Sequence, residues 1–145
     1  MSDVLTLSQI RMPGTARSKD DAIRETGEIL VDAGAVTPAY IDSMFERERS
    51  VSTYMGNYLA IPHGTNESKE SIKRSALSVI RYTDPIDWDG NEVLFALGIA
   101  GYQGGHMDIL SRIAIVFSDT DEVDKLVAAR SAEEIYALLN AVNQE

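Results

Sequence analysis

The 145-residue sequence has no cysteine, only two histidines and few basic residues. Without cysteine there is no disulfide framework, no thiolate zinc site and no cysteine nucleophile. Two imidazoles are too few for a three-histidine zinc site, so any metal would depend mainly on carboxylates. The 13 Lys and Arg against 23 Asp and Glu give a formal net charge of -10, which repels phosphate backbones and argues against nucleic-acid binding. This charge favours basic protein partners.

Long hydrophobic runs are also missing. The longest apolar stretch, residues 93–100, is far shorter than the roughly 18 residues that indicate a membrane-spanning helix. The first residues lack the basic and apolar regions of a signal peptide. We therefore expect no direct membrane insertion and a cytoplasmic location. The length predicts one domain over residues 1–145, because two cores would each approach the size that needs disulfides or metals.

Strands are predicted wherever short β-branched or alternating stretches end in turn residues. The stretch 93–99 is apolar on both faces and is expected to be a central strand. The other expected strands cover residues 4–10, 58–61 and 75–82.

Helices are predicted from apolar side chains spaced about 3.6 residues apart and from start signals. Ser18, Thr37 and Ser131 are expected to begin three helices, and Gly34 to end the first. Two further helices are expected, one from His106 and one around residues 123–127. Together with the strands they predict an α/β fold, with a mixed parallel and antiparallel sheet of about five strands and α-helices on both faces.

His63 is the first candidate for chemistry, because it follows the end of a short strand directly. Residues at strand ends are held by the sheet and remain open to a partner on one side. Gly64 allows a phosphate or another protein to approach the backbone, and Thr65 adds a hydroxyl and an amide. The alternative interpretation is an exposed loop histidine without a role.

His106 is the second candidate, because it follows a glycine-rich passage and lies in the first turn of a predicted helix. Free amides and the helix dipole stabilise an anion there, although a histidine that only hydrogen-bonds at a helix start is the alternative. As a pair with His63, one neutral imidazole can act as nucleophile while the other donates a hydrogen bond.

Arg47 is a candidate for binding phosphate, because a guanidinium matches two phosphate oxygens at once. It lies with Arg49 at the end of the second predicted helix, shortly before His63. The alternative is ordinary charge pairing within Glu46-Arg47-Glu48-Arg49.

Other motifs in the sequence give weaker evidence of a functional site. The glycines at 98, 101, 104 and 105 do not match a dinucleotide loop, and no P-loop is present, so a nucleotide site is not expected. Asp87 and Asp89 are interpreted as turn formers around Trp88. A metal site at His63 and His106 is a weaker alternative, because no carboxylate ligands can be assigned to it.

Several motifs together resemble one known family. They are FERER at residues 45–49, TYMGN at 53–57, AIPHGT at 60–65, Lys69, the apolar strand 93–99 and GHMDIL at 105–110. In order and spacing they resemble the mannitol/fructose-type enzyme IIA domains of the bacterial phosphoenolpyruvate-dependent sugar phosphotransferase system. The resemblance covers essentially the whole chain, and the combined pattern is specific, whereas Pro-His-Gly alone is not.

The resemblance implies a phosphoryl carrier. His63 would accept a phosphoryl group from phospho-HPr and pass it to a cysteine of the enzyme IIB domain of a membrane sugar permease. His106 would assist by hydrogen bonding, Arg47 would contribute at the site, and Gly64 and Thr65 would form the phosphate environment. No cofactor or metal is implied. Without cysteine the chain cannot hold the enzyme IIB site itself.

Mannitol is the sugar that the resemblance favours, with fructose or another polyol next. A regulatory role is the competing hypothesis. Related domains of the nitrogen-type phosphotransferase branch, or within transcription regulators, use phosphorylation of the same histidine to switch protein contacts. The sequence leaves both roles open.

Overall fold

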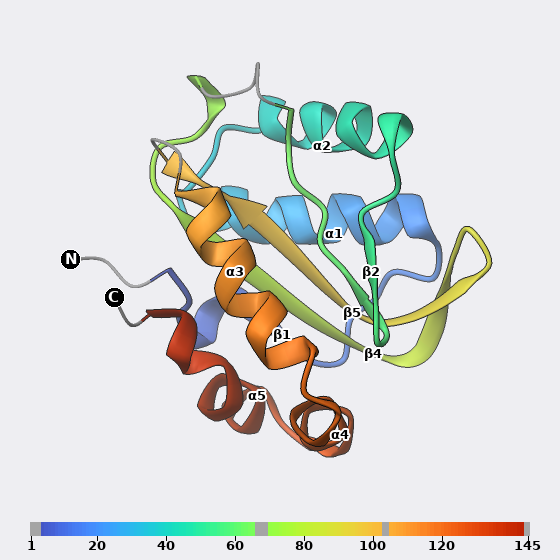
Figure 1. Cartoon of the computed structure of the whole chain (residues 1–145). Helices are drawn as coiled ribbons and strands as arrows, with labels where there is room; N and C mark the ends of the chain where they lie inside the picture. The colour runs from blue at the N-terminus through green and yellow to red at the C-terminus, as the bar shows by residue number, and fades with distance from the viewer. Residues whose placement is uncertain (1–3, 66–69, 103–104, 144–145) are drawn as a thin grey trace.

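The computed structural model describes residues 4–65, 70–102 and 105–143. Its five-stranded sheet has the order β1-β4-β5-β3-β2 (Figure 1). The β1–β4 and β3–β5 pairs are parallel, and the β4–β5 and β2–β3 pairs are antiparallel. The strands are β1 (Ile10–Arg11), β2 (Tyr54–Gly56), β3 (Leu59–Ala60), β4 (Ala76–Trp88) and β5 (Asn91–Ala100). The predicted mixed sheet and the central position of β5 are confirmed.

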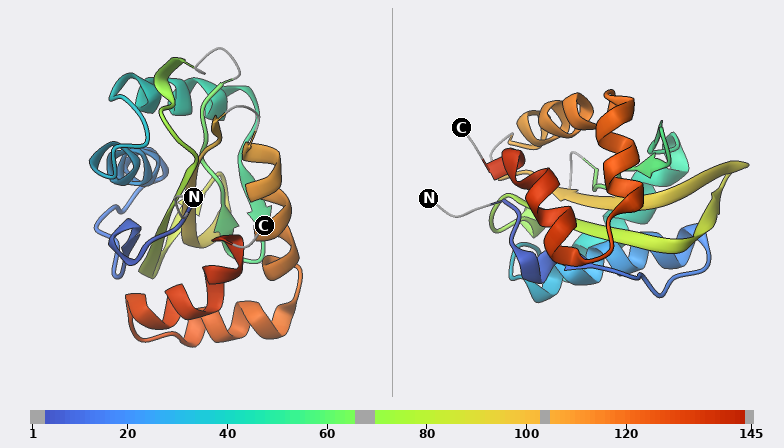
Figure 2. Two further views of the ribbon diagram at one scale, coloured as in Figure 1. Left: turned by 90° about the vertical axis from the view of Figure 1, so that its left-hand side faces the viewer. Right: turned by 90° about the horizontal axis from the view of Figure 1, so that it is seen from below.

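Five α-helices lie in the described part of the chain, and they cover both faces of the sheet, as predicted. Figure 2 shows α1 and α2 on one side of the sheet and α3 on the other. None of the helices in the described ranges is both long and apolar enough to cross a membrane. The helices are α1 (Lys19–Asp32), α2 (Ala39–Ser50), α3 (His106–Phe117), α4 (Thr120–Ala128) and α5 (Ala132–Leu139).

Two helices begin with side-chain caps, and one ends at a glycine, where the sequence predicts them. The Ser18 hydroxyl accepts a hydrogen bond from the Asp21 amide (3.2 Å), and Ser131 accepts one from Glu134 (3.1 Å). Gly34 follows α1 with a φ of 75°, a left-handed conformation that glycine adopts without strain. Thr37 differs, because no side-chain cap opens α2; its carbonyl oxygen accepts from the Tyr40 amide instead (3.0 Å).

The strand expected at residues 4–10 is wrong for most of its length. Leu7–Gln9 form a 3-10 turn, and only Ile10–Arg11 pair with β4. The buried Gln9 side chain explains the difference, because its amide donates to the carbonyl oxygens of Val4 (2.9 Å) and Leu77 (2.7 Å). These bonds replace part of a backbone ladder. The sequence also gives no prediction for β2, which pairs with β3 through a tight turn.

Two hydrophobic clusters lie on opposite faces of the sheet, because alternate side chains of a strand point to opposite sides. From β5, Phe95 and Leu97 pack with α3, α4 and α5, whereas Ala96 and Ala100 pack with α1 and α2. The α1 side of β5 is close-packed: a Cβ on Gly98 would lie 2.8 Å from the Thr26 Cβ. Small residues on β5 therefore bring α1 close to the sheet.

Candidate functional site

His63 lies just beyond β3 and is held by the central strand. The β3–β5 register pairs Leu59 with Phe95, and the same offset continues to a parallel bridge between His63 and Ile99. The Ile99 amide donates to the Pro62 carbonyl oxygen at 2.9 Å. The backbone of His63 is thus fixed beside the carboxyl end of β5, and its position after a short strand is as the sequence predicts.

The imidazole of His63 has a defined tautomer. Its Nδ1 lies 2.8 Å from the carbonyl oxygen of Ile61, which can only accept a hydrogen bond. Nδ1 must therefore carry the proton, and in the neutral ring Nε2 holds the lone pair. The ring is half-buried. This arrangement leaves Nε2 as the ring nitrogen whose lone pair could serve as a nucleophile.

The loop after His63 is attached to helix α2 through Tyr40. The Gly64 amide donates to the Tyr40 hydroxyl (2.9 Å), and this hydroxyl donates to the Ile99 carbonyl oxygen (2.7 Å). Burial raises the pKa of Tyr40 to about 12, against an opposing effect of the Gly64 hydrogen bond. The hydroxyl therefore keeps its proton near neutral pH. Thr65 follows in the same loop and is half-buried.

His106 is the first residue of α3, as the sequence predicts. Because β3 and β5 are parallel and each is followed by one histidine, the topology brings His63 and His106 to the same edge of the sheet. The segment before α3 is tied to the start of β4, since the Tyr102 amide donates to the Ser75 hydroxyl at 2.8 Å. The His106 side chain, Lys69 and Gly104 lie outside the described residues.

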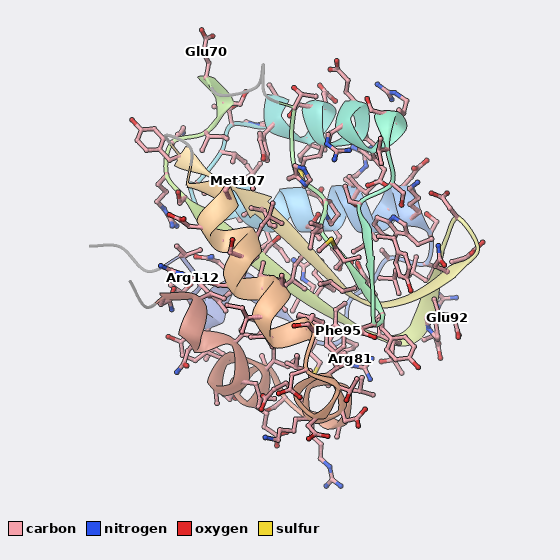
Figure 3. All side chains as sticks on the ribbon, viewed as in Figure 1. Glu70, Arg81, Glu92, Phe95, Met107 and Arg112 are labelled. Carbon is pink, nitrogen blue, oxygen red and sulfur yellow. The ribbon has the colours of Figure 1, made fainter. Side chains whose placement is uncertain are left out.

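The N-terminus of α3 has the chemistry of an anion site. No side chain within the described ranges caps this helix, whose N-cap residue is Gly105. Uncapped first-turn amides and the helix dipole stabilise negative charge. Met107, labelled in Figure 3, is 60% exposed beside them. A partner protein can therefore approach this end of the helix.

Arg47 lies in the last turn of α2. Its Nη1 donates to the Val51 carbonyl oxygen at 2.8 Å, which uses one of the five guanidinium N–H donors. Among the ion pairs of the described residues, none joins Arg47 to Glu46 or Glu48, so the expected alternative of helix pairing is not observed. Arg47 lies about two helical turns from Tyr40.

Glu48 is connected to the site, although from the sequence it is considered only as part of the charge pairing in residues 46–49. Its side chain is buried, and its carboxylate accepts from the Thr53 amide (3.0 Å) and from Trp88 Nε1 (3.2 Å). The Thr53 carbonyl oxygen accepts from the Ile61 amide, and the Ile61 carbonyl accepts from His63. Glu48 therefore holds a backbone connection that leads to the His63 ring.

Within residues 4–65, 70–102 and 105–143, no three His, Asp or Glu side chains gather closely enough to hold a metal ion. The structure thus adds no ligand set to the metal-site alternative.

Comparison with known families matches the sequence of this chain to one of them. The family described as "Phosphoenolpyruvate-dependent sugar phosphotransferase system, EIIA 2" matches residues 3–142. The chain belongs to this family. The predicted resemblance is confirmed, and the chain is an enzyme IIA component that transfers phosphoryl groups in sugar uptake.

Similar curated proteins share the length of this chain. The mannitol-specific phosphotransferase enzyme IIA component of Halalkalibacterium halodurans is 50% identical over 141 residues, which cover 97% of both proteins. The protein of the same description from Geobacillus stearothermophilus is 46% identical over 141 residues, again 97% of both. Both alignments include nearly the whole of this enzyme IIA chain.

Solved structures show the same fold. The crystal structure of IIA mannitol from Escherichia coli has a TM-score of 0.86 at 28% identity and covers 93% of this chain and 98% of that one. A complex of Escherichia coli enzyme IIAMTL with phosphorylated enzyme IIBMTL has the same score and identity, with 93% and 96% covered. The nitrogen regulatory protein IIA-Ntr of Neisseria meningitidis has a TM-score of 0.77 at 28% identity, with 94% and 96% covered.

Proposed function

We propose that this enzyme IIA component carries a phosphoryl group on His63, from phospho-HPr to a cysteine of an enzyme IIB, for the uptake of mannitol. The Nδ1–Ile61 hydrogen bond supports this assignment, because it leaves Nε2 of His63 as the unprotonated nucleophile. The relatives that are 46% to 50% identical support mannitol, since both are described as mannitol-specific. They also argue against the regulatory alternative.

Two displacements at phosphorus complete the reaction. Nε2 of His63 forms a bond to the phosphoryl group as the P–N bond of the donor phosphohistidine breaks, and the donor imidazole leaves with the electron pair. A cysteine thiolate of enzyme IIB then attacks the same phosphorus, and the pair returns to Nε2. Such loose transition states need positioning and charge stabilisation, which suit Arg47, His106 and the N-terminus of α3. Gly64, which lets a phosphate approach the backbone closely, and Thr65, with its hydroxyl and amide, complete the proposed phosphate environment.

The proposed partners agree with the charge of the protein. A net charge of -10 favours docking on basic surfaces, while Arg47 and the α3 N-terminus provide local positive potential. An enzyme IIB acceptor is supported by the Escherichia coli complex, which joins a similar enzyme IIA to phosphorylated enzyme IIB. We take residues 1–145 as one such domain, located in the cytoplasm, where phosphoenolpyruvate is produced.

The test is transfer of labelled phosphate from phosphoenolpyruvate through enzyme I and HPr to the purified protein. His63→Ala should abolish labelling while the circular dichroism spectrum stays unchanged. His106→Ala and Arg47→Ala should label more slowly. Labelling of His63→Ala at the wild-type level would contradict the assignment. Adding membrane permeases that lack their own enzyme IIA then identifies the sugar, and phosphorylation of mannitol is the expected result.

A further inference from the structure

The hydroxyl of Tyr40 lies inside the backbone ladder that holds His63. In a regular parallel pair, the residue opposite His63 would donate its amide to the Pro62 carbonyl oxygen. Its own carbonyl oxygen would accept a hydrogen bond from the Gly64 amide. Ile99 makes the first of these bonds directly, at 2.9 Å. The second is replaced by a relay, in which Gly64 donates to the Tyr40 hydroxyl and Tyr40 donates to Ile99.

One oxygen atom is therefore inserted between the Gly64 amide and the central strand. Because two hydrogen bonds in series span more distance than one, the chain is held away from β5 directly after the histidine. The regular part of β3 ends at Ala60, the contact with β5 continues as a bridge between His63 and Ile99, and the backbone leaves β5 after His63. The Tyr40 hydroxyl therefore determines where the loop after His63 separates from β5.

We propose that Tyr40 is a positioning residue for phosphoryl transfer, whose hydroxyl sets the direction of the Gly64 amide and thereby the angle at which His63 presents Nε2. The inference rests on the proposed function of His63. The His63 ring is bound to the Ile61 carbonyl on one side of its backbone, and Gly64 fixes the backbone on the other. The orientation of the ring therefore depends on both attachments.

The environment of Tyr40 keeps this relay intact over the working pH range. The side chain is 2% exposed, and burial raises its pKa to about 12. A protonated hydroxyl donates one hydrogen bond and accepts another, which is what the two backbone groups require. Phenylalanine would fill the same core space without either bond. The ladder would then close directly between Gly64 and Ile99, or both groups would lose their partner.

The chain offers a matched control in Tyr82. It belongs to the same hydrophobic cluster, is 1% exposed, and donates its hydroxyl to Glu25 (2.8 Å). Tyr82→Phe therefore removes one buried hydroxyl from the same core, but its partner lies on α1 and outside the site. An equal loss of transfer rate in both variants would show a general effect of removing a buried hydroxyl from the core.

The experiment measures initial rates of transfer from phospho-HPr to wild type, Tyr40→Phe and Tyr82→Phe. Misplacement of reacting atoms by about 1 Å costs up to 100-fold, and we expect about a tenfold lower kcat for Tyr40→Phe with little change in KM. Tyr82→Phe should keep the wild-type rate. Nitrogen-15 spectra of the unphosphorylated proteins provide a second readout. Tyr40→Phe should shift the Gly64 amide and increase exchange between the two His63 tautomers, and Tyr82→Phe should do neither.

The outcomes separate this inference from the function on which it rests. Wild-type protein that takes no label on His63 would overturn both. Labelled wild type with Tyr40→Phe at the same rate would overturn the positioning role alone, even if the spectra differ. Equal losses in Tyr40→Phe and Tyr82→Phe would also overturn it, because they would show a general effect of the core.

Discussion

The two faces of the sheet are built differently. Most of the buried polar side chains lie on the α1–α2 face and make specific hydrogen bonds there, whereas the side chains under α3, α4 and α5 are mainly apolar. Hydrophobic contact is non-directional, while hydrogen bonds fix positions and angles. The apolar face should therefore supply stability, and the polar face should orient His63 through Tyr40 and Glu48. The buried polar side chains that belong to α1 or α2 or bond to them are Glu25, Thr26, Ser43, Glu48, Thr53 and Ser78.

The largest expected effect is a loss of stability on the apolar face. Leu126 of α4 is fully buried, and Leu126→Ala leaves a cavity that should lower the free energy of unfolding by about 4 kcal/mol. Urea denaturation measures this loss. Transfer per folded molecule should stay at the wild-type rate, because Leu126 packs in the cluster under α3, α4 and α5, whereas Tyr40, which attaches the His63 loop to α2, packs in the other cluster. Asp124→Ala, an exposed change on the same helix, is the control. A large loss of transfer rate in folded Leu126→Ala would break the proposed separation.

The next effect is on the polar face and should change stability and transfer together. Glu48→Ala leaves the buried Thr53 amide and Trp88 Nε1 without their acceptor, which should cost about 3 kcal/mol. It also releases the backbone connection from Thr53 through Ile61 to His63, so transfer from phospho-HPr should slow.

Glu48→Gln sharpens this prediction. The amide oxygen of Gln can still accept a hydrogen bond, so part of the stability and part of the transfer rate should return. If Glu48→Ala loses stability but transfers phosphate at the wild-type rate, the connection through Thr53 does not control His63.

Local signals in the sequence predict much of the fold. Ser18 and Ser131 act through bonds to residues three positions away, so their roles are visible in a short window. The apolar run of β5 predicts a central strand because burial on both faces requires it. The expected positions of His63 after a strand and of His106 at a helix start are also confirmed, because neighbouring residues in the sequence mark the ends of those elements.

The remaining features depend on contacts between distant segments. Tyr40 belongs to an apolar helical stripe, and nothing local distinguishes a core tyrosine from one that enters a backbone ladder 59 residues away along the chain. Glu48 stands in a run of alternating charges, where each residue has the pattern of a solvated surface. Its burial follows from the approach of Trp88, 40 residues later. Gln9 also depends on a distant contact, because its side-chain amide donates to the Leu77 carbonyl oxygen in place of a strand hydrogen bond.

The smallest expected effect is an acid sensitivity of the polar face. Burial alone raises the pKa of Glu25, but the hydrogen bonds it receives outweigh burial and hold the pKa below its ordinary value of 4.5. A depressed folded-state pKa stabilises the protein above pH 4.5, and this contribution is lost as the pH falls through the folded-state value. The donors are Thr15, Arg11, Tyr82 and Ala16.

Glu25→Gln isolates this contribution, because the other carboxylates are the same in both proteins. Gln presents an amide group to donors that need an acceptor, so the variant should be less stable than wild type at pH 7. The difference should shrink as the pH falls from 4.5 through the folded-state pKa of wild-type Glu25, where the carboxyl group takes up a proton and also presents a donor. Urea denaturation at a series of pH values measures it. A difference that stays constant down to the acid transition would show that Glu25 is not the group that titrates. In that case the acid sensitivity would not belong to the α1 side of the sheet.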